Sequence, residues 1–261
     1  MISDSELRRR PRADGAAQKT ESIDREAAEL LSSRVLRFLD EERRLTSRYL
    51  HDATAQNLMG ISMTLHRALA RADGSDVELR GLLAEGILLA EKSIGEIRML
   101  SYSLHPPFLD EAGLAPALRW YVKSAGARVK MTIHLEMPDA IARMPRDIET
   151  AIFRIAQEAI ANAQEHSGSP AITVRLTHTE SSVMLEVEDR GCGMAINGDP
   201  HSDLAEPVQG FGISGMEART KLLGGTFNLI TEVGKGTTIR VALPAETLGA
   251  QRSAAAGKHK S

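Results

Sequence analysis

An amide, a carboxylate and three glycine clusters follow one another in the second half of the chain. Asn162 comes first, and Asp189 stands at the end of an alternating segment that begins at Ser182. The glycine clusters hold Gly191 and Gly193, then Gly210, Gly212 and Gly215, and finally Gly234 and Gly236 with Thr237 and Thr238. An amide oxygen suits Mg²⁺, a carboxylate accepts hydrogen bonds from an exocyclic amine, and glycines let the backbone approach a ligand closely. The order and spacing of this set predict a site for ATP with Mg²⁺.

Glu158, Asn162 and His166 share one face of a predicted helix, because they are spaced four residues apart. Taken alone, a polar stripe of this kind most often only faces water. The glycine clusters that follow it change the interpretation. The helix expected after the second cluster offers free N–H groups and a dipole that suit a polyphosphate.

A second candidate for chemistry is His51, which is followed by Asp52 and, one helical turn later, by Gln56. A neutral imidazole is a competent nucleophile toward a γ-phosphoryl group, and an adjacent carboxylate can orient the ring and take its proton. Gln56 could position a water for the reverse task, the hydrolysis of a phosphorylated partner. A packed structural histidine is the alternative, because His51 lies seven residues before Leu58 on an apolar stripe.

Two long helices are expected to position these residues. The first is predicted from about residue 26 to residue 72, where no proline occurs and apolar residues recur at helical spacing. The step from Leu45 to Leu58 is thirteen rather than fourteen residues, so the apolar stripe shifts beside the histidine. After a turn, a second helix is expected from about Val77 to Leu104. Such a hairpin leaves apolar surface exposed, and pairing two copies into a four-helix bundle would bury it.

The period of the apolar pattern changes after Pro106 and Pro107, which end the second helix. Residues 131–137 alternate as a strand, and Pro145 opens a helix that Gly168 closes. Further strands are predicted at Ile172 to Leu176, Val183 to Val187, Phe227 to Ile230 and Thr238 to Leu243, with helices near Leu114 to Val122 and Met216 to Leu223. This interleaving indicates an α/β layer with helices on one face of a mixed sheet.

The composition is that of an ordinary folded protein: of 261 residues, 42% are hydrophobic and 26% are charged, with a net charge of -3. The lack of a basic excess argues against a surface that coats nucleic acid. A single cysteine, Cys192, allows no internal disulfide and fits a reducing cytoplasm. No apolar run approaches the roughly 18 residues that span a bilayer. Residues 1–25 and 247–261 are polar and are expected to be disordered tails.

Residues 126–246 resemble the ATPase domain shared by histidine kinases, gyrase, Hsp90-type chaperones and MutL, known as the GHKL or Bergerat fold. Residues 157–163 resemble the N box of that family, and the clusters that begin at Asp189, Gly210 and Gly234 resemble its three glycine boxes. The resemblance implies an αβα sandwich with a flexible lid, here at residues 194–209.

The same resemblance implies that Asn162 binds Mg²⁺, that Asp189 binds the adenine, and that Glu158 assists the metal or a water. Two positions depart from the family pattern. Glu165 stands where Lys or Arg often lies near the phosphates, and it would repel them. Arg190 stands where Asn or Asp is common, and it is expected to point to solvent.

Residues 42–56 resemble the dimerisation and phosphoacceptor helix of one histidine kinase subfamily, which pairs with response regulators bearing a LuxR/NarL-type helix-turn-helix. Residues 104–114 resemble its linker motif, although the subfamily usually has Arg where His105 stands. The resemblance implies that His51 is the phosphorylated residue, Asp52 the general base and Gln56 the phosphatase residue.

The sequence thus predicts an α+β protein with a helical hairpin at residues 26–105, a linker at 106–125 and a GHKL ATP-binding domain at 126–246. The hairpin is expected to form a dimeric four-helix bundle. The expected function is that of a cytoplasmic, homodimeric two-component sensor histidine kinase, which phosphorylates itself on His51 and passes the phosphoryl group to a response regulator aspartate. Two alternatives stay open: a GHKL ATPase clamp in which Glu158 activates water, and a non-catalytic or phosphatase-biased dimeric regulator, which Glu165 would favour.

Overall fold

The computed structural model describes residues 13–129, 131–194 and 211–245. The chain divides into two compact units, residues 1–40 and residues 41–261. The first helix, α1, spans Ala13–Tyr49 and so begins earlier than the predicted start at about residue 26. The expected disordered tail is therefore helical from residue 13 onward. Three alanines, Ala13, Ala16 and Ala17, open this segment and are followed by single good helix formers at Gln18, Lys19 and Glu21, so helix propensity acts where no apolar stripe marks a helix.

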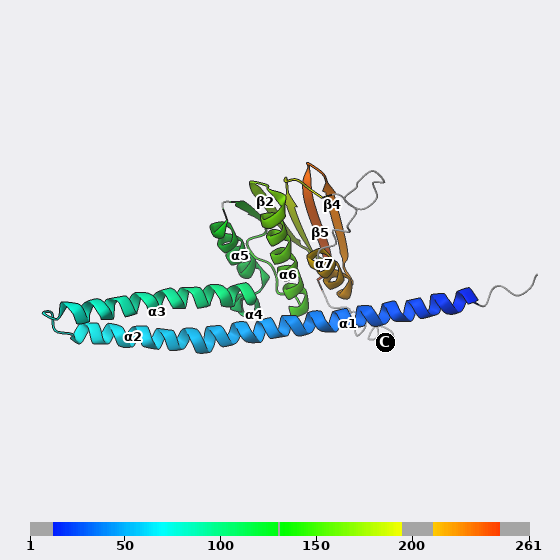
Figure 1. The fold of residues 1–261 in the computed structure, drawn as a ribbon. Helices are drawn as coiled ribbons and strands as arrows, with labels where there is room; N and C mark the ends of the chain where they lie inside the picture. The colour runs from blue at the N-terminus through cyan, green and yellow to red at the C-terminus, as the bar shows by residue number, and fades with distance from the viewer. Residues whose placement is uncertain (1–12, 130, 195–210, 246–261) are drawn as a thin grey trace, which may run out of the picture. The chain divides into compact units, whose positions relative to one another are not determined.

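Helices α2 (Gln56–Arg71) and α3 (Val77–Leu104) lie side by side as the predicted hairpin (Figure 1). Asp76 caps α3, because its side chain accepts a hydrogen bond from the backbone N–H of Leu79 at 2.9 Å. Ile87 and Ile94 are buried, whereas Leu88 is 66% exposed. A single copy of the hairpin therefore leaves much of its apolar surface uncovered. Within the described ranges, every helix lacks the sustained apolar stretch that a bilayer crossing needs.

A π-helical turn, η1 (Leu50–Ala55), separates α1 from α2. Ser47 before this turn, Ala55 at its end and Ser62 after it are buried. Ala55 follows Ser47 by eight residues, whereas Ser62 follows Ala55 by seven. The wider turn takes up the extra residue and keeps the three on one face. The predicted shift of the apolar stripe beside His51 coincides with this turn.

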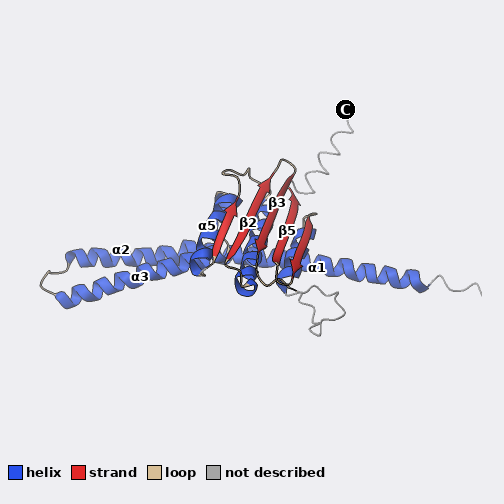
Figure 2. Ribbon diagram, turned by 90° about the horizontal axis from the view of Figure 1, so that it is seen from above, coloured by secondary structure: helices blue, strands red, loops and turns tan. Residues whose placement is uncertain are grey.

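Five strands form one mixed sheet in the order β1-β2-β3-β5-β4 (Figure 2). The strands are β1 (Thr132–Glu136), β2 (Ala171–His178), β3 (Ser182–Asp189), β4 (Thr226–Glu232) and β5 (Gly236–Pro244). β1 runs parallel to β2, and the other neighbouring pairs are antiparallel. Each strand overlaps the segment that its alternating pattern predicts.

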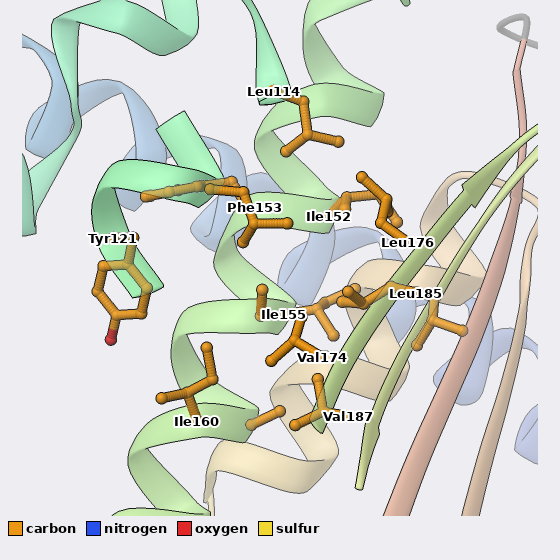
Figure 3. Close-up of a cluster of buried hydrophobic side chains, with 14 of the residues drawn as sticks. Leu114, Tyr121, Ile152, Phe153, Ile155, Ile160, Val174, Leu176, Leu185 and Val187 are labelled. Atoms are coloured by element: carbon orange, nitrogen blue, oxygen red, sulfur yellow. The ribbon is translucent and has the colours of Figure 1, made fainter. Parts of the chain in front are cut away.

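The core lies between one face of this sheet and a layer of helices. The helices are α5 (Leu114–Arg128), α6 (Arg146–Asn162) and α7 (Phe211–Leu222). Ile152 and Ile155 of α6 are fully buried, as are Val174 of β2 and Leu185 of β3. Figure 3 shows these side chains pointing toward one another from the helix and the strands. Alternate strand residues supply this apolar face, as the period of two requires.

The opposite face of the sheet is charged. Arg175 of β2 donates hydrogen bonds to Glu136 at 2.8 Å, to Glu186 at 2.7 Å and to Glu188 at 2.8 Å. Arg240 of β5 also bonds Glu186, at 2.7 Å. The prediction of helices on one face of a mixed sheet is confirmed.

The segment expected to be a linker, residues 106–125, belongs to this core instead. It forms α4 (Pro107–Glu111) and most of α5. Leu109, Leu114 and Leu118 are at most 2% exposed and join the apolar cluster of the sheet domain. The physical reason is that α5 is amphipathic and buries its apolar side against α6, so the compact domain begins before residue 126.

Candidate functional site

Helix α6 carries Asn162 at its end. Its last turn passes into a second π-helical segment, η2 (Ala163–Ser167), which Gly168 ends in the left-handed conformation with φ 64°. Both π-helical segments of the described ranges adjoin candidate chemistry, since η1 contains His51 and η2 follows Asn162. Such turns are rare and occur frequently at functional sites.

Asp189 ends strand β3 and is 7% exposed. Its Oδ1 accepts a hydrogen bond from the backbone N–H of Gly191 at 2.9 Å. This bond holds the carboxylate in place. The second oxygen makes no hydrogen bond within the described residues, so it can accept one from a ligand.

Glycines bring three backbone segments together around Asp189. A Cβ at Gly191 would lie 2.0 Å from the backbone oxygen of Ser167, and one at Gly193 would lie 2.1 Å from that of Glu232. The N–H of Cys192 also donates to Ser167, at 2.8 Å. Gly193 has φ +62°, a conformation that disfavours side chains. The first glycine box is therefore locked against η2 and β4 by contacts that a larger residue would prevent.

A cavity of about 190 Å³ opens between η2, the first glycine box, α7 and β5. The predicted site residues that line it are Asn162, Asp189, Gly193, Gly212 and Thr237. Sequence reasoning assigned no role in binding to the other lining residues, which are Ala159, Ala163, His166, Ser167, Val187, Cys192, Met194, Ile213 and Ile239. The apolar ones read as ordinary core, and the spacing of His166 from Asn162 was the one available signal. The cavity joins a buried carboxylate to apolar walls, an arrangement suited to an aromatic base with an exocyclic amine.

Several predicted residues lie beside this cavity without lining it. Thr238 pairs with Glu188 in the sheet and alternates with Thr237, so it belongs to the opposite face. A Cβ at Gly212 would lie 2.1 Å from Oε1 of Glu158, which places that carboxylate against the start of α7. Gly191 and Gly236 shape the backbone around Asp189, whereas Gly210 and nearly all of the expected lid lie outside the described residues.

The second glycine box differs from the expectation that it precedes a helix. Helix α7 begins at Phe211, so Gly212 and Gly215 lie within its first turns. A Cβ at Gly215 would meet nothing within 4 Å. The sequence predicted a later start for this helix, near Met216, because glycine is a poor helix former. The backbone N–H groups of the first turn are consequently those of the glycine box itself.

Neither of the two residues that depart from the family pattern lines the cavity. The side chain of Glu165 is 72% exposed, lies 3.9 Å from His166 and does not line the cavity. The side chain of Arg190 is 84% exposed and lies 3.5 Å from Glu188, so the expectation that it points to solvent is confirmed. Glu165 therefore adjoins the cavity only through His166, which does line it.

His51 lies at a separate place, in η1. Its Nδ1 is 3.1 Å from Oδ1 of Asp52. The ring stacks on Tyr102, with 6.0 Å between the centroids and 24° between the planes. Tyr102 in turn meets the edge of Trp120 at 4.7 Å, which links the imidazole to α5. The side chain of His51 is 37% exposed, so it is neither the packed core histidine of the alternative interpretation nor free in solvent.

A second cavity, of about 140 Å³, is lined by His51 and Asp52 together with residues from both sides of the hairpin end. Asp110 lies on its wall, at ion-pair distance from Arg44 (3.8 Å), Arg48 (3.6 Å) and Arg146 (3.2 Å). One carboxylate thereby connects α1, α4 and α6. Gln56 is exposed and lines neither cavity.

His105 stands at the C-terminal end of α3 and is 3% exposed. Its Nε2 lies 3.5 Å from Oδ1 of Asp110, and neither ring nitrogen has a hydrogen-bond partner among the described residues. Burial lowers the pKa of His105, while the nearby Asp110 carboxylate acts in the opposite direction. The site thus holds an uncharged imidazole at neutral pH.

Two protein-family models match the chain. Residues 42–109 match the model described as "Histidine kinase", and residues 147–247 match "Histidine kinase-, DNA gyrase B-, and HSP90-like ATPase". The two matches contain the two sites in turn: His51 with Asp52, and Asn162 with Asp189.

Curated relatives match over both regions. The oxygen sensor histidine kinase NreB of Staphylococcus carnosus is 30% identical over 205 residues, which are 78% of this chain and 57% of that protein. The signal transduction histidine-protein kinase/phosphatase DegS of Brevibacillus brevis is 28% identical over 216 residues, which are 82% of this chain and 54% of that protein. The chain spans about half the length of these relatives. A solved structure, the histidine kinase domain of the blue-light activated histidine kinase of Erythrobacter litoralis EL346, aligns with a TM-score of 0.44 at 15% identity and covers 73% of this chain and 94% of that one.

Proposed function

We propose, on the premise that the chain belongs to the histidine kinase family, that it transfers the γ-phosphoryl group of ATP to His51 and then to an aspartate of a response regulator. One observation carries the proposal. A single chain holds both a cavity of about 190 Å³ around the buried carboxylate of Asp189 and an imidazole whose Nδ1 lies 3.1 Å from the carboxylate of Asp52. ATP as the phosphoryl donor favours a cytoplasmic site of reaction.

Asp52 prepares His51 as the nucleophile. An ionised carboxylate only accepts hydrogen bonds, so the contact with Asp52 requires the Nδ1 of His51 to carry the proton. The lone pair is then on Nε2, which attacks the γ-phosphorus as the bond to the oxygen bridging the β-phosphate breaks and ADP leaves. The Nδ1 proton passes to Asp52 and from there to water. Stacking on Tyr102 limits the rotation of the ring and so favours one direction of attack.

The cavity around Asp189 would take the base of the nucleotide. The second oxygen of Asp189 would accept the amino group of adenine, and Val187, Ile213 and Ile239 would contact the faces of the base. The amide oxygen of Asn162 would hold Mg²⁺, which neutralises charge on the polyphosphate when bound. The carboxylate of Glu158 contacts the start of α7. We propose that it holds this first turn in place beside the bound metal.

The hairpin supplies the surface for two protein partners. Its uncovered apolar residues, such as Leu82, Leu88 and Met63, are more than half exposed and support a homodimer in which two hairpins form a four-helix bundle. The exposed Gln56, one turn after Asp52, supports contact with a response regulator of the LuxR/NarL type and a role in its dephosphorylation.

The proposal is tested by incubating the full chain with γ-labelled ATP and Mg²⁺. We expect an acid-labile phosphoprotein in the wild type and no label in His51→Gln. The variant should keep the oligomeric state and helical content of the wild type, because His51 is partly exposed. An unlabelled wild type that still binds ATP would contradict the proposed function.

A further inference from the structure

The cavity beside His51 shares no lining residue with the ATP site. Its walls come from the end of α1 with η1, from the end of α3 and from α4. The lining residues are Arg44, Ser47, Arg48, His51, Asp52, His105, Pro107, Asp110 and Glu111. A group bonded to the ring of His51 therefore has this cavity within reach, together with its two guanidinium groups.

A phosphoryl group on His51 adds close to two negative charges, which need cationic hydrogen-bond donors. Arg44 is already engaged: its Nε and Nη2 donate to the carboxylate of Glu41 at 3.0 Å and 2.5 Å. His105 is buried and uncharged at neutral pH, because burial lowers its pKa. Neither residue is a free cation for an incoming phosphoryl group.

Arg48, in contrast, is charged, and no carboxylate among the described residues holds it by a hydrogen bond. Its side chain is 54% exposed, and within the described part of the chain its one ion pair is with Asp110, at 3.6 Å. It stands in the last turn of α1, three residues before His51, and the two side chains line the same cavity. Arg48 therefore has the charge, the position and the freedom to meet a group on the ring.

The ion pair between Arg48 and Asp110 is loose. At 3.6 Å it is longer than a charge-assisted hydrogen bond, and it makes no hydrogen bond. Asp110 also lies 3.2 Å from Arg146, so it keeps a cationic neighbour when Arg48 moves away. A phosphoryl group offers a guanidinium two parallel, shorter bonds, which makes the exchange of partners favourable.

We propose that Arg48 leaves Asp110 on phosphorylation and holds the phosphoryl group of phospho-His51. This inference rests on the proposed function, because it concerns the product of that reaction. Arg48 is thereby a phosphoryl-binding residue, and Asp110 is its alternative partner in the unphosphorylated chain. The carboxylates of Asp52, Asp110 and Glu111 also line the cavity and oppose the same charge, so Arg48 must offset them.

The test is the equilibrium between the two forms of His51. The full chain is incubated with labelled ATP and Mg²⁺ at a series of ADP concentrations. At each concentration the labelled fraction is measured once it no longer changes with time. The equilibrium constant is the concentration of phosphoprotein times that of ADP, divided by the concentration of unphosphorylated chain times that of ATP. Changes that only slow the reaction do not alter this constant.

We expect Arg48→Gln to lower the constant about tenfold, since a charge-assisted bond is lost. Arg48→Lys should lie between the two, because it keeps the charge without the bidentate geometry. Asp110→Asn should raise the constant, because it removes the competing carboxylate. Arg43→Gln is the matched control, since Arg43 is exposed on the same helix and does not line the cavity.

Equal constants for the wild type and Arg48→Gln would overturn the inference, and so would a fall in Asp110→Asn. Thermal unfolding of the unphosphorylated Arg48→Gln variant checks that it folds as the wild type does. A wild type that takes up no label overturns the proposed function and this inference with it. A labelled wild type with an unchanged Arg48→Gln constant overturns the inference alone.

Discussion

The backbone oxygen of Asp189 lies 2.1 Å from the point where a side chain at Gly236 would begin. Gly236 also has φ +95°, in the region that side chains disfavour. The first residue of β5 is thus packed directly on the last residue of β3, whose carboxylate we assign to the adenine. The third glycine box thus supports the proposed nucleotide site through the backbone of Asp189.

Gly236→Ala should therefore destabilise the protein by at least about 2 kcal/mol, because it adds both backbone strain and a clash with Asp189. The free energy of unfolding in urea measures this effect. Gly234→Ala is the matched control, since it has φ +79° in the same turn and a Cβ there meets nothing within 4 Å. It should cost only the strain, about 1 kcal/mol. Equal losses in the two variants would contradict the assigned contact.

Gly215→Ala should stabilise the protein by about 0.5–1 kcal/mol. Gly215 lies inside α7, where alanine is the better helix former, and a Cβ there meets nothing within 4 Å. ATP affinity should not change, because Gly215 does not line the cavity. Thermal unfolding measures the change in stability, and titration calorimetry measures the affinity for ATP. A loss of ATP affinity would contradict this prediction and support the nucleotide-binding role that the sequence pattern predicts for Gly215.

The sequence predicted the strands and long helices because their apolar residues repeat with a clear period. Asn162, Asp189 and Thr237 were found because amide, carboxylate and hydroxyl groups stand out beside glycines, and all three line the cavity. The walls made by Val187 and Ile239 were not found, since an apolar residue has the same pattern in a core and in a pocket.

Features that depend on contacts between distant segments also escaped prediction. Helix α5 read as part of a linker, because its apolar residues show their role only when Leu118 meets the core. His105 read as a change from the family pattern, and its burial beside Asp110 depends on how α3 and α4 pack. Local pattern carries no information about such partners.

Asp189→Asn should weaken the binding of an ATP analogue by tenfold or more, since the amide loses the charged acceptor for the exocyclic amine. The fold should persist, because the amide oxygen still accepts from the N–H of Gly191. Titration calorimetry measures the affinity. Glu188→Gln is the control, because Glu188 precedes Asp189 on the same strand but bonds Arg175 on the charged face. Equal losses in both variants would speak against adenine recognition by Asp189.

Asp52→Asn should slow autophosphorylation by roughly a hundredfold, because a general base is lost. The affinity for ATP should stay at the wild-type value, since Asp52 lines the other cavity. Single-turnover labelling at saturating ATP separates the two effects. A variant that labels as fast as the wild type would show that the contact between Asp52 and His51 only orients the ring.

His105 should make the protein less stable in acid. Its ring is buried, burial lowers its pKa in the folded state, and Asp110, Arg154 and Arg146 are the charged groups that act on it. The unfolded chain therefore binds more protons than the folded one once the pH falls below the unfolded pKa of about 6.5. The free energy of unfolding should decrease as the pH drops through this value.

His105→Gln removes this titration, so its free energy of unfolding should fall less steeply than that of the wild type between pH 7.5 and pH 5. Urea unfolding at each pH gives the two profiles. His178→Gln is the control, since His178 lies at the end of β2 and takes no part in the contacts around Asp110. Parallel profiles for the wild type and His105→Gln would show that the ring stays protonated on folding, held by the carboxylate of Asp110 against the cost of burial.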